Sequence, residues 1–191
     1  MTSAIRMAGW GRIADGALVT WTVAEGRKGR RWREVVSRHD GGVEHALLLE
    51  TAPGGRFSHL ELARADGLWT FHPEADGTLH GNHVGPDGPG VRHFAGRPFG
   101  PDDAVIVEGS PLSLAAIAWR WSGTGSDAEP SERTVAGVVI GADGQLRELP
   151  DVRIERQAPR RWRVGEGSAF EIDGLGLPVL DDGEIRPLEL G

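Results

Sequence analysis

The chain has 191 residues, a formal net charge of -7 at pH 7 and a sequence pI of about 5.5. This acidic balance argues against a nucleic-acid-binding surface, because a negative domain repels phosphate unless its basic residues are clustered. The absence of cysteine excludes disulfides and thiolate chemistry. With no signal peptide and no apolar run of the ~18 to 20 residues that a membrane span needs, we expect a cytoplasmic protein that does not span a membrane.

The first part of the chain predicts a series of short strands. We expect a loosely docked start over Met1–Gly9 and a strand over Ala17–Ala24, where β-branched and aromatic residues alternate with others. The stretch Arg31–Arg38 fits a strand or a short helix equally well. Strands over Val43–Thr51 and Arg56–Ala63 should form a hairpin, because a short turn that contains glycine separates them.

A second hairpin is predicted from Leu68–His72 and Thr78–Val84, since an Asp-Gly turn lies between them. Ser110 before a proline is typical of a helix start, and Leu112–Ala118 predicts a short buried helix; residues 119–121 fit helix or strand. The polar stretch Ser122–Glu132 predicts a loop. Further short strands are expected over Val91–Phe94, Ala104–Glu108, Thr134–Ile140, Asp151–Arg156, Trp162–Val164, Ala169–Ile172, Leu177–Leu180 and Ile185–Leu190.

Together these elements predict a mainly β fold. Their short connections favour a curved antiparallel sheet that forms a half-barrel or a barrel, with one short helix. We expect a single β-rich domain over residues 1–191, with its core at about 19–156 and a C-terminal β extension at 161–191.

The stretch Leu68–Phe99 holds most of the side chains that could carry chemistry. Its four histidines are His72, His80, His83 and His93. Imidazole binds zinc, copper or iron, and Glu74 or Asp76 could add a carboxylate. However, residues 80 and 83 face opposite sides of a strand unless Gly81 introduces a bulge. Hydrogen bonding to a ligand or a turn, and a structural role, are the alternatives, and no metal or cofactor is predicted.

The tryptophans and the basic clusters leave two further choices open. Tryptophans on predicted strands fill a core or line a ligand cavity; they are Trp21, Trp32, Trp69, Trp119, Trp121 and Trp162. The basic runs Arg27–Arg33 and Arg160–Arg163 indicate solvated strand ends, with a phosphate or nucleic-acid patch as the alternative.

Three segments resemble the putative glycolipid-binding domain family. They are LWTFHPEADGTLHGN at 68–82, VRHFAGRPF at 91–99 and VVIGADGQLRELPDVRIER at 138–156. The resemblance covers roughly Val19–Arg156, and Gly81–Val84 replaces the family's Cys-Asp-Val-Asp segment. It implies a curved antiparallel sheet that forms an incomplete barrel around a helix, similar to lipoprotein carriers, and a glycolipid-like ligand.

The favoured hypothesis is a non-enzymatic protein that binds a small hydrophobic or glycolipid-like molecule in a β-barrel cavity. Its predicted ligand-binding residues are Trp69, Phe71, His72, Glu74, His80, Asn82, His83, Arg92, His93 and Arg97. One alternative is a small metal-dependent or cofactor-free enzyme that uses the histidine cluster with Glu74. Another is a module that binds a protein partner through its strand edges. A homodimer is left open, and no catalytic residue is predicted.

Overall fold

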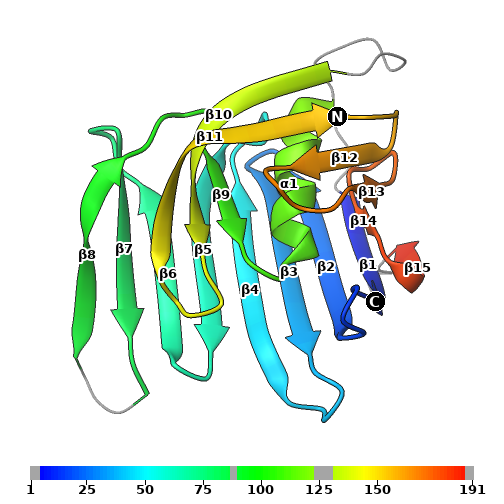
Figure 1. Cartoon of the computed structure of the whole chain (residues 1–191), viewed down its shortest axis with the longest axis horizontal. Coiled ribbons are helices and arrows are strands. Elements are labelled where there is room, and N and C mark those ends of the chain that lie inside the picture. Colours follow the sequence, from blue (N-terminus) through cyan, green and yellow to red (C-terminus); the bar gives the residue numbers. More distant parts are fainter. Residues whose placement is uncertain (1–4, 87–89, 123–130, 188–191) are drawn as a thin grey trace. The chain divides into compact units, whose positions relative to one another are not determined.

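The computed structural model describes residues 5–86, 90–122 and 131–187. The chain forms two compact units, Met1–Pro101 with Leu180–Gly191, and Asp102–Val179. The first unit is a nine-stranded antiparallel sheet, in the order β15-β1-β2-β3-β4-β5-β6-β7-β8, that curves into a half-barrel (Figure 1). Its strands are β1 Ile5–Arg12, β2 Leu18–Gly26, β3 Gly29–Ser37, β4 Val43–Thr51, β5 Phe57–Arg64, β6 Gly67–Pro73, β7 Thr78–Val84, β8 Val91–Pro98 and β15 Asp181–Pro187.

Alternation along these strands gives the sheet one buried face, which we call the inner face. Side chains on one surface of a strand recur at every second residue, so burial with that period means that one surface is covered. The inner face comprises Val19, Trp21, Val23, Arg30, Trp32, Glu34, Val36, His45, Leu47, Leu49, Thr51, Leu60, Leu62, Trp69, Phe71 and Leu79. The residues between them lie on the outer face.

The second unit is a six-stranded sheet, in the order β14-β13-β12-β11-β10-β9, with the single described helix, α1, packed on β9 and β12. Its elements are β9 Ala104–Val107, α1 Pro111–Ser122, β10 Ser131–Ile140, β11 Leu146–Arg156, β12 Arg161–Val164, β13 Phe170–Ile172 and β14 Pro178–Val179. The expected mainly β fold with one helix and a curved sheet is therefore confirmed. One detail was wrong: β9 and β10 are parallel, because α1 provides the crossover that parallel neighbours need.

The N-terminal boundary of α1 agrees with the sequence, and residues 119–121, which the sequence left open between helix and strand, are helical. Ser110 Oγ accepts a hydrogen bond from the Ser113 N–H at 3.1 Å, and Pro111 is the first helical residue, as expected of a capped start. The helix continues to Ser122, so Trp119 and Trp121 lie on the helix rather than on a strand. Of the predicted loop at 122–132, residues 123–130 lie outside the described part of the chain.

The start of the chain differs most from the prediction. A loosely docked start was expected over Met1–Gly9, yet Ile5–Arg12 forms β1. This strand pairs with β2 and with β15, which comes from the other end of the chain. The ambiguous stretch Arg31–Arg38 also belongs to a strand, β3, that pairs with β2 and β4. Both β1 and β3 are therefore strands because they pair with neighbouring strands, although their local sequences do not clearly predict a strand.

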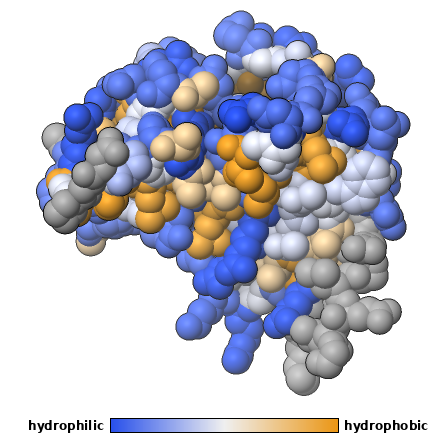
Figure 2. Space-filling model, turned by 90° about the horizontal axis from the view of Figure 1, so that it is seen from below, coloured by the Kyte–Doolittle hydropathy of each residue, from blue (hydrophilic) through white to orange (hydrophobic). Residues whose placement is uncertain are grey.

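The surface mixes hydrophilic side chains with isolated hydrophobic ones. Seen from below, some of the hydrophobic residues lie side by side on the viewed face, next to many hydrophilic ones (Figure 2). Among the described residues the exposed large hydrophobic side chains are Trp10, Val43, Leu68, Val84, Val91 and Val179. None of the helical segments that the structure describes is both long and apolar enough to cross a membrane.

Candidate functional site

One register row of the inner face carries both polar and aromatic side chains across eight neighbouring strands. From β1 to β8 its members are Gly9, Trp21, Glu34, Leu47, Leu62, Trp69, His83 and Arg92. Directly opposed residues have Cβ atoms about 5 Å apart, so Trp21 and Glu34 are neighbours. Three strand spacings of about 4.8 Å separate Glu34 from Trp69. The row thus contains a polar centre near β3 and an aromatic cluster near β6.

The polar centre is built around a completely buried pair of ionisable residues. His45 Nε2 lies 3.0 Å from Glu34 Oε1, and neither side chain is exposed to solvent. The two residues come from adjacent strands, β3 and β4, and both follow the phase of the apolar inner-face residues around them. A buried ion pair is often no more stable than apolar residues of the same volume, so stability alone does not explain this pair.

Four ring nitrogens of the inner face have no hydrogen-bond partner among the residues that the structure describes. They are Nε1 of Trp21, Trp32 and Trp69, and Nδ1 of His45, and all four atoms are buried. More than about 90% of buried polar groups in native proteins are paired, with protein or with ordered water. These nitrogens therefore leave hydrogen-bonding capacity on the inner face that ordered water or a ligand can take up, as does Trp162 Nε1 in the second unit.

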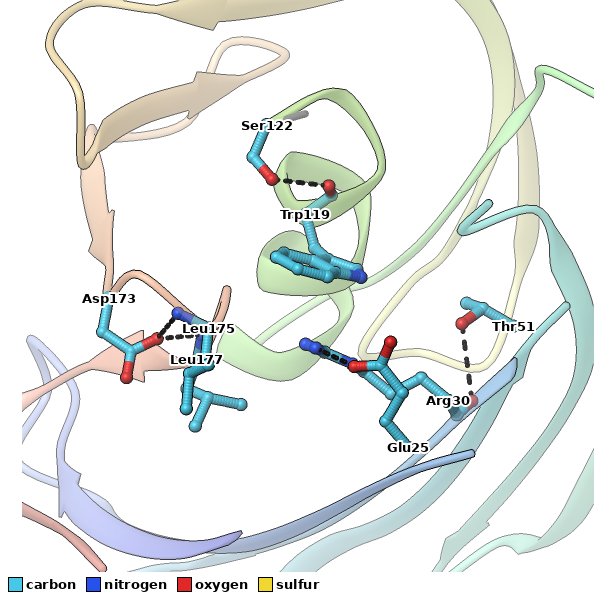
Figure 3. A network of polar contacts seen from close by, with 8 residues as sticks. All are labelled: Glu25, Arg30, Thr51, Trp119, Ser122, Asp173, Leu175 and Leu177. Atoms are coloured by element: carbon cyan, nitrogen blue, oxygen red, sulfur yellow. Dashed lines mark hydrogen bonds and ion pairs between the residues drawn. The ribbon is translucent and has the colours of Figure 1, made fainter. Parts of the chain in front are cut away.

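A third buried polar residue, Arg30, lies at one end of the inner face. Its Nε donates to Glu25 Oε2 at 3.0 Å, and its guanidinium carbon lies 4.8 Å from the centre of the Trp32 ring. Thr51 Oγ1 donates to the carbonyl oxygen of Arg30 at 3.4 Å (Figure 3). The Arg30 cation is therefore paired with Glu25 and packed on Trp32 within the first unit.

The aromatic cluster lies on β6, β7 and β8. The Trp69 ring stacks on His83 at 4.1 Å and on Phe94 at 5.3 Å between centroids. Phe71 lies opposite Gly81, where an added Cβ would come within 2.4 Å of the Phe71 ring. The absence of a side chain at position 81 therefore makes the space that Phe71 occupies. Trp69, Phe71 and Phe94 together form a wide apolar surface.

The predicted ligand-binding residues are divided between the two faces of the sheet. Trp69, Phe71, His83 and Arg92 follow the inner-face phase, and Arg97 lies opposite the inner-face residue Leu79. His72, His80, Asn82 and His93 lie on the outer face, and Glu74 follows β6 in the adjoining turn, where it contacts His72. The structure therefore brings together two smaller groups instead of one cluster.

The outer-face group consists of local hydrogen-bonded pairs. His72 Nε2 lies 2.9 Å from Glu74 Oε1, and His93 Nδ1 lies 2.6 Å from Asn82 Oδ1. His83, on the other face, donates from Nε2 to the Asp66 carbonyl oxygen at 2.9 Å and so fixes the β5–β6 turn. Within the described part of the chain, no three His, Cys, Asp or Glu side chains are arranged to hold a metal ion.

Glu34 and His45 were not among the residues predicted from sequence. A signal for His45 exists, because it alternates in phase with Leu47 and Leu49 on β4. The inward direction of Glu34 could not be predicted, because the stretch 31–38 fits helical spacing as well as strand spacing. Once β3 is a strand, Glu34 lies in phase with Trp32 and Val36 and must face inward.

Comparison with known proteins gives a match at the level of the fold. No family model matches the sequence, and no curated protein matches it. The crystal structure of a DUF1089 family protein from Pseudomonas aeruginosa is similar, with a TM-score of 0.50 and 14% sequence identity. The match covers 84% of this chain and 86% of that chain. At this identity the similarity shows a shared, mainly β fold with a half-barrel sheet.

Proposed function

We propose that the protein binds a small amphipathic, glycolipid-like molecule on the inner face of its half-barrel and that it is not an enzyme. The observation that carries the proposal is the set of unpaired ring nitrogens on Trp21, Trp32, Trp69 and His45. Most of the other side chains on this surface are apolar, although it also carries Arg30, Glu34 and Thr51. Such a combination suits a ligand with an apolar part and a few polar groups.

The hydrogen-bonding character of these nitrogens favours a hydroxyl-rich head group. Nδ1 of the His45 ring donates or accepts a hydrogen bond according to the tautomer. The three indole Nε1–H groups are donors only. A hydroxyl group can satisfy both kinds of partner, since it donates one hydrogen bond and accepts others. An ionised fatty-acid carboxylate offers acceptors alone.

The apolar part of the ligand is assigned to the aromatic cluster of Trp69, Phe71 and Phe94. Three strand spacings of about 4.8 Å put this cluster about 14 Å from Glu34 along the row. The resemblance of the segments at 68–82, 91–99 and 138–156 to the glycolipid-binding family supports the same class of ligand. The lipoprotein-carrier-like architecture implied by that resemblance agrees with the half-barrel sheet.

A titration with three related compounds tests the proposal. Octyl glucoside, kept below its critical micelle concentration, has both parts of the ligand, whereas octanol and glucose have one part each. Tryptophan fluorescence should change saturably with octyl glucoside, with an affinity at least about tenfold above that of octanol, because each added hydrogen bond to a buried group contributes about 1 kcal/mol. A flat response to octyl glucoside, or equal affinities for octyl glucoside and octanol, would contradict the proposal.

A further inference from the structure

A groove follows β2 on the outer face, opposite to the surface discussed above. Along the groove the outward side chains of β2 are small, namely Thr20, Thr22 and Ala24, whereas most of the outward side chains of β1 and β3 beside them are larger. β1 and β3 are two strand spacings apart, or about 10 Å. The groove therefore results from side-chain size along three neighbouring strands, and its width suits a single sugar ring.

The groove consists of two hollows that share residues. One, of about 350 Å³, is lined by Trp10, Thr20, Thr22, Arg33 and Glu184, and also by Gly9, Trp21 and Glu34 of the inner-face row. The other, of about 290 Å³, is lined by Arg6, Arg31, Arg33, Thr22, Val23 and Ala24. Because both are lined by Thr22 and Arg33, they form one continuous groove with a tryptophan end and an arginine end.

The arginine end is positively charged on a protein whose net charge is -7. Arg31 donates to Glu50 at 2.6 Å, which leaves this guanidinium partly neutralised. Arg6 and Arg33 make no hydrogen bond or ion pair with any residue of the described ranges, and both are exposed. Guanidinium groups bind carboxylate and phosphate in a bidentate manner. Two unpaired guanidiniums around the Thr22 hydroxyl therefore form a site for a compact anion.

The tryptophan end has the residues expected around a sugar ring. Trp10 is 39% exposed, which is unusual for a residue whose ring is mostly apolar. Its Nε1 donates to Glu184 Oε2 at 3.5 Å, so the carboxylate lies at the edge of the ring. The flat, apolar faces of pyranose rings stack on indole, and their hydroxyl groups bond to side chains such as Thr20 and Glu184.

We propose that this outer groove binds an anionic sugar, a single ring that bears a carboxylate or a phosphate. The ring stacks on Trp10, and the anionic group lies between Arg6 and Arg33. Thr22 and Arg33 point away from the inner face, so the site opens on the opposite side of the sheet, although Trp21 and Glu34 also line its tryptophan end. The basic run at 27–33 thereby contributes Arg31 and Arg33 to a ligand site.

Isothermal titration calorimetry of the intact protein at low salt tests this site with five compounds: glucuronate, glucose 6-phosphate, glucose, inorganic phosphate and AMP. We expect one-to-one binding of glucuronate, glucose 6-phosphate or both, at least about tenfold tighter than glucose or phosphate, since one charge-assisted hydrogen bond is worth about tenfold. Binding of only one of these two sugars identifies the anionic group. No binding of either, or binding of AMP or phosphate as tightly as the sugars, overturns the proposal.

Three variants locate the binding. R33Q should weaken the anionic sugar about tenfold, and W10L should weaken it more than W10F, which keeps an aromatic ring. R56Q removes the same charge from an exposed arginine outside the groove and should leave the affinity unchanged. W69F removes an inner-face indole N–H outside both hollows and should also leave it unchanged, so this site and the inner-face site fail independently. Equal effects of R33Q and R56Q contradict the assignment.

Discussion

His45 Nε2 lies 3.0 Å from Glu34 Oε1, and both side chains are completely shielded from solvent. The pair occupies two inner-face positions at which the neighbouring strands carry valine, leucine and tryptophan. An apolar pair of similar volume is often equally stable or more stable, because removal of two ionisable groups from water is costly. Packing alone therefore does not explain the pair. A role in binding a ligand explains it better.

The first prediction separates the stability of this pair from its function. H45L leaves Glu34 buried without its ring partner and should lower the free energy of unfolding by about 3 kcal/mol, as expected when one member of a buried pair is removed. E34M/H45L should recover at least half of that loss. Urea unfolding monitored by circular dichroism measures both values. A double variant that is as unstable as H45L would mean that the pair is mainly structural.

The second prediction concerns the space that Phe71 takes from Gly81. A Cβ at position 81 would lie 2.4 Å from the Phe71 ring, so G81A should lower the free energy of unfolding by about 2 kcal/mol through overpacking. G26A is the matched control, because no atom lies within 4 Å of a Cβ at Gly26. Its effect should stay within about 0.5 kcal/mol. Equal effects of the two substitutions in a thermal melt would exclude the packing argument.

Much of the sheet could be predicted where the local pattern was strong. The strand Val43–Thr51 was predicted with the bounds that β4 has, because its alternation is supported by turn residues on both sides. The strand β1 was missed, because Ile5–Arg12 has little β-branched character and is held by pairing with β2 and β15. The parallel pairing of β9 with β10 also could not be predicted from local sequence, since it depends on the crossover through α1.

The candidate site could be predicted only in part. Trp69, Phe71 and His83 were chosen from their composition, and register places all three in one inner-face cluster. The polar centre was missed, because recognition of Glu34 needs the strand phase of β3, and a helical spacing masked that phase. Composition finds residues that can do chemistry, whereas the side of the sheet on which they lie depends on register.

The third prediction is a pH effect at the β6–β7 turn. Thr78 donates from Oγ1 to the Asp76 carboxylate, and this hydrogen bond holds the pKa of Asp76 below its ordinary value of 3.8. Because the pKa is lower in the folded state, the contribution to stability is present above pH 3.8 and is lost as the pH falls through the folded-state pKa. In T78V the pKa of Asp76, followed by NMR titration, should rise toward 3.8. An unchanged pKa in T78V would refute this assignment.

The fourth prediction tests the cap of α1. Ser110 Oγ accepts the Ser113 N–H at 3.1 Å, so S110A leaves a buried helix-terminal donor unpaired. The substitution should lower the free energy of unfolding by about 1 kcal/mol, and S110T should retain most of the stability. S131A, at an exposed strand position, is the comparison, and its effect should remain below about 0.5 kcal/mol. The cap has no energetic role if S110A and S131A unfold at the same urea concentration.

We propose that ring nitrogens of the inner face bind the head group of an amphipathic ligand. The most direct test is a ¹⁵N–¹H NMR titration of the indole N–H groups with octyl glucoside. The account predicts that the resonances of Trp21, Trp32 and Trp69 shift saturably, because these N–H groups gain a partner, whereas that of Trp10, bonded to Glu184, shifts much less. Unchanged resonances of the three inner-face tryptophans at saturating ligand would contradict it.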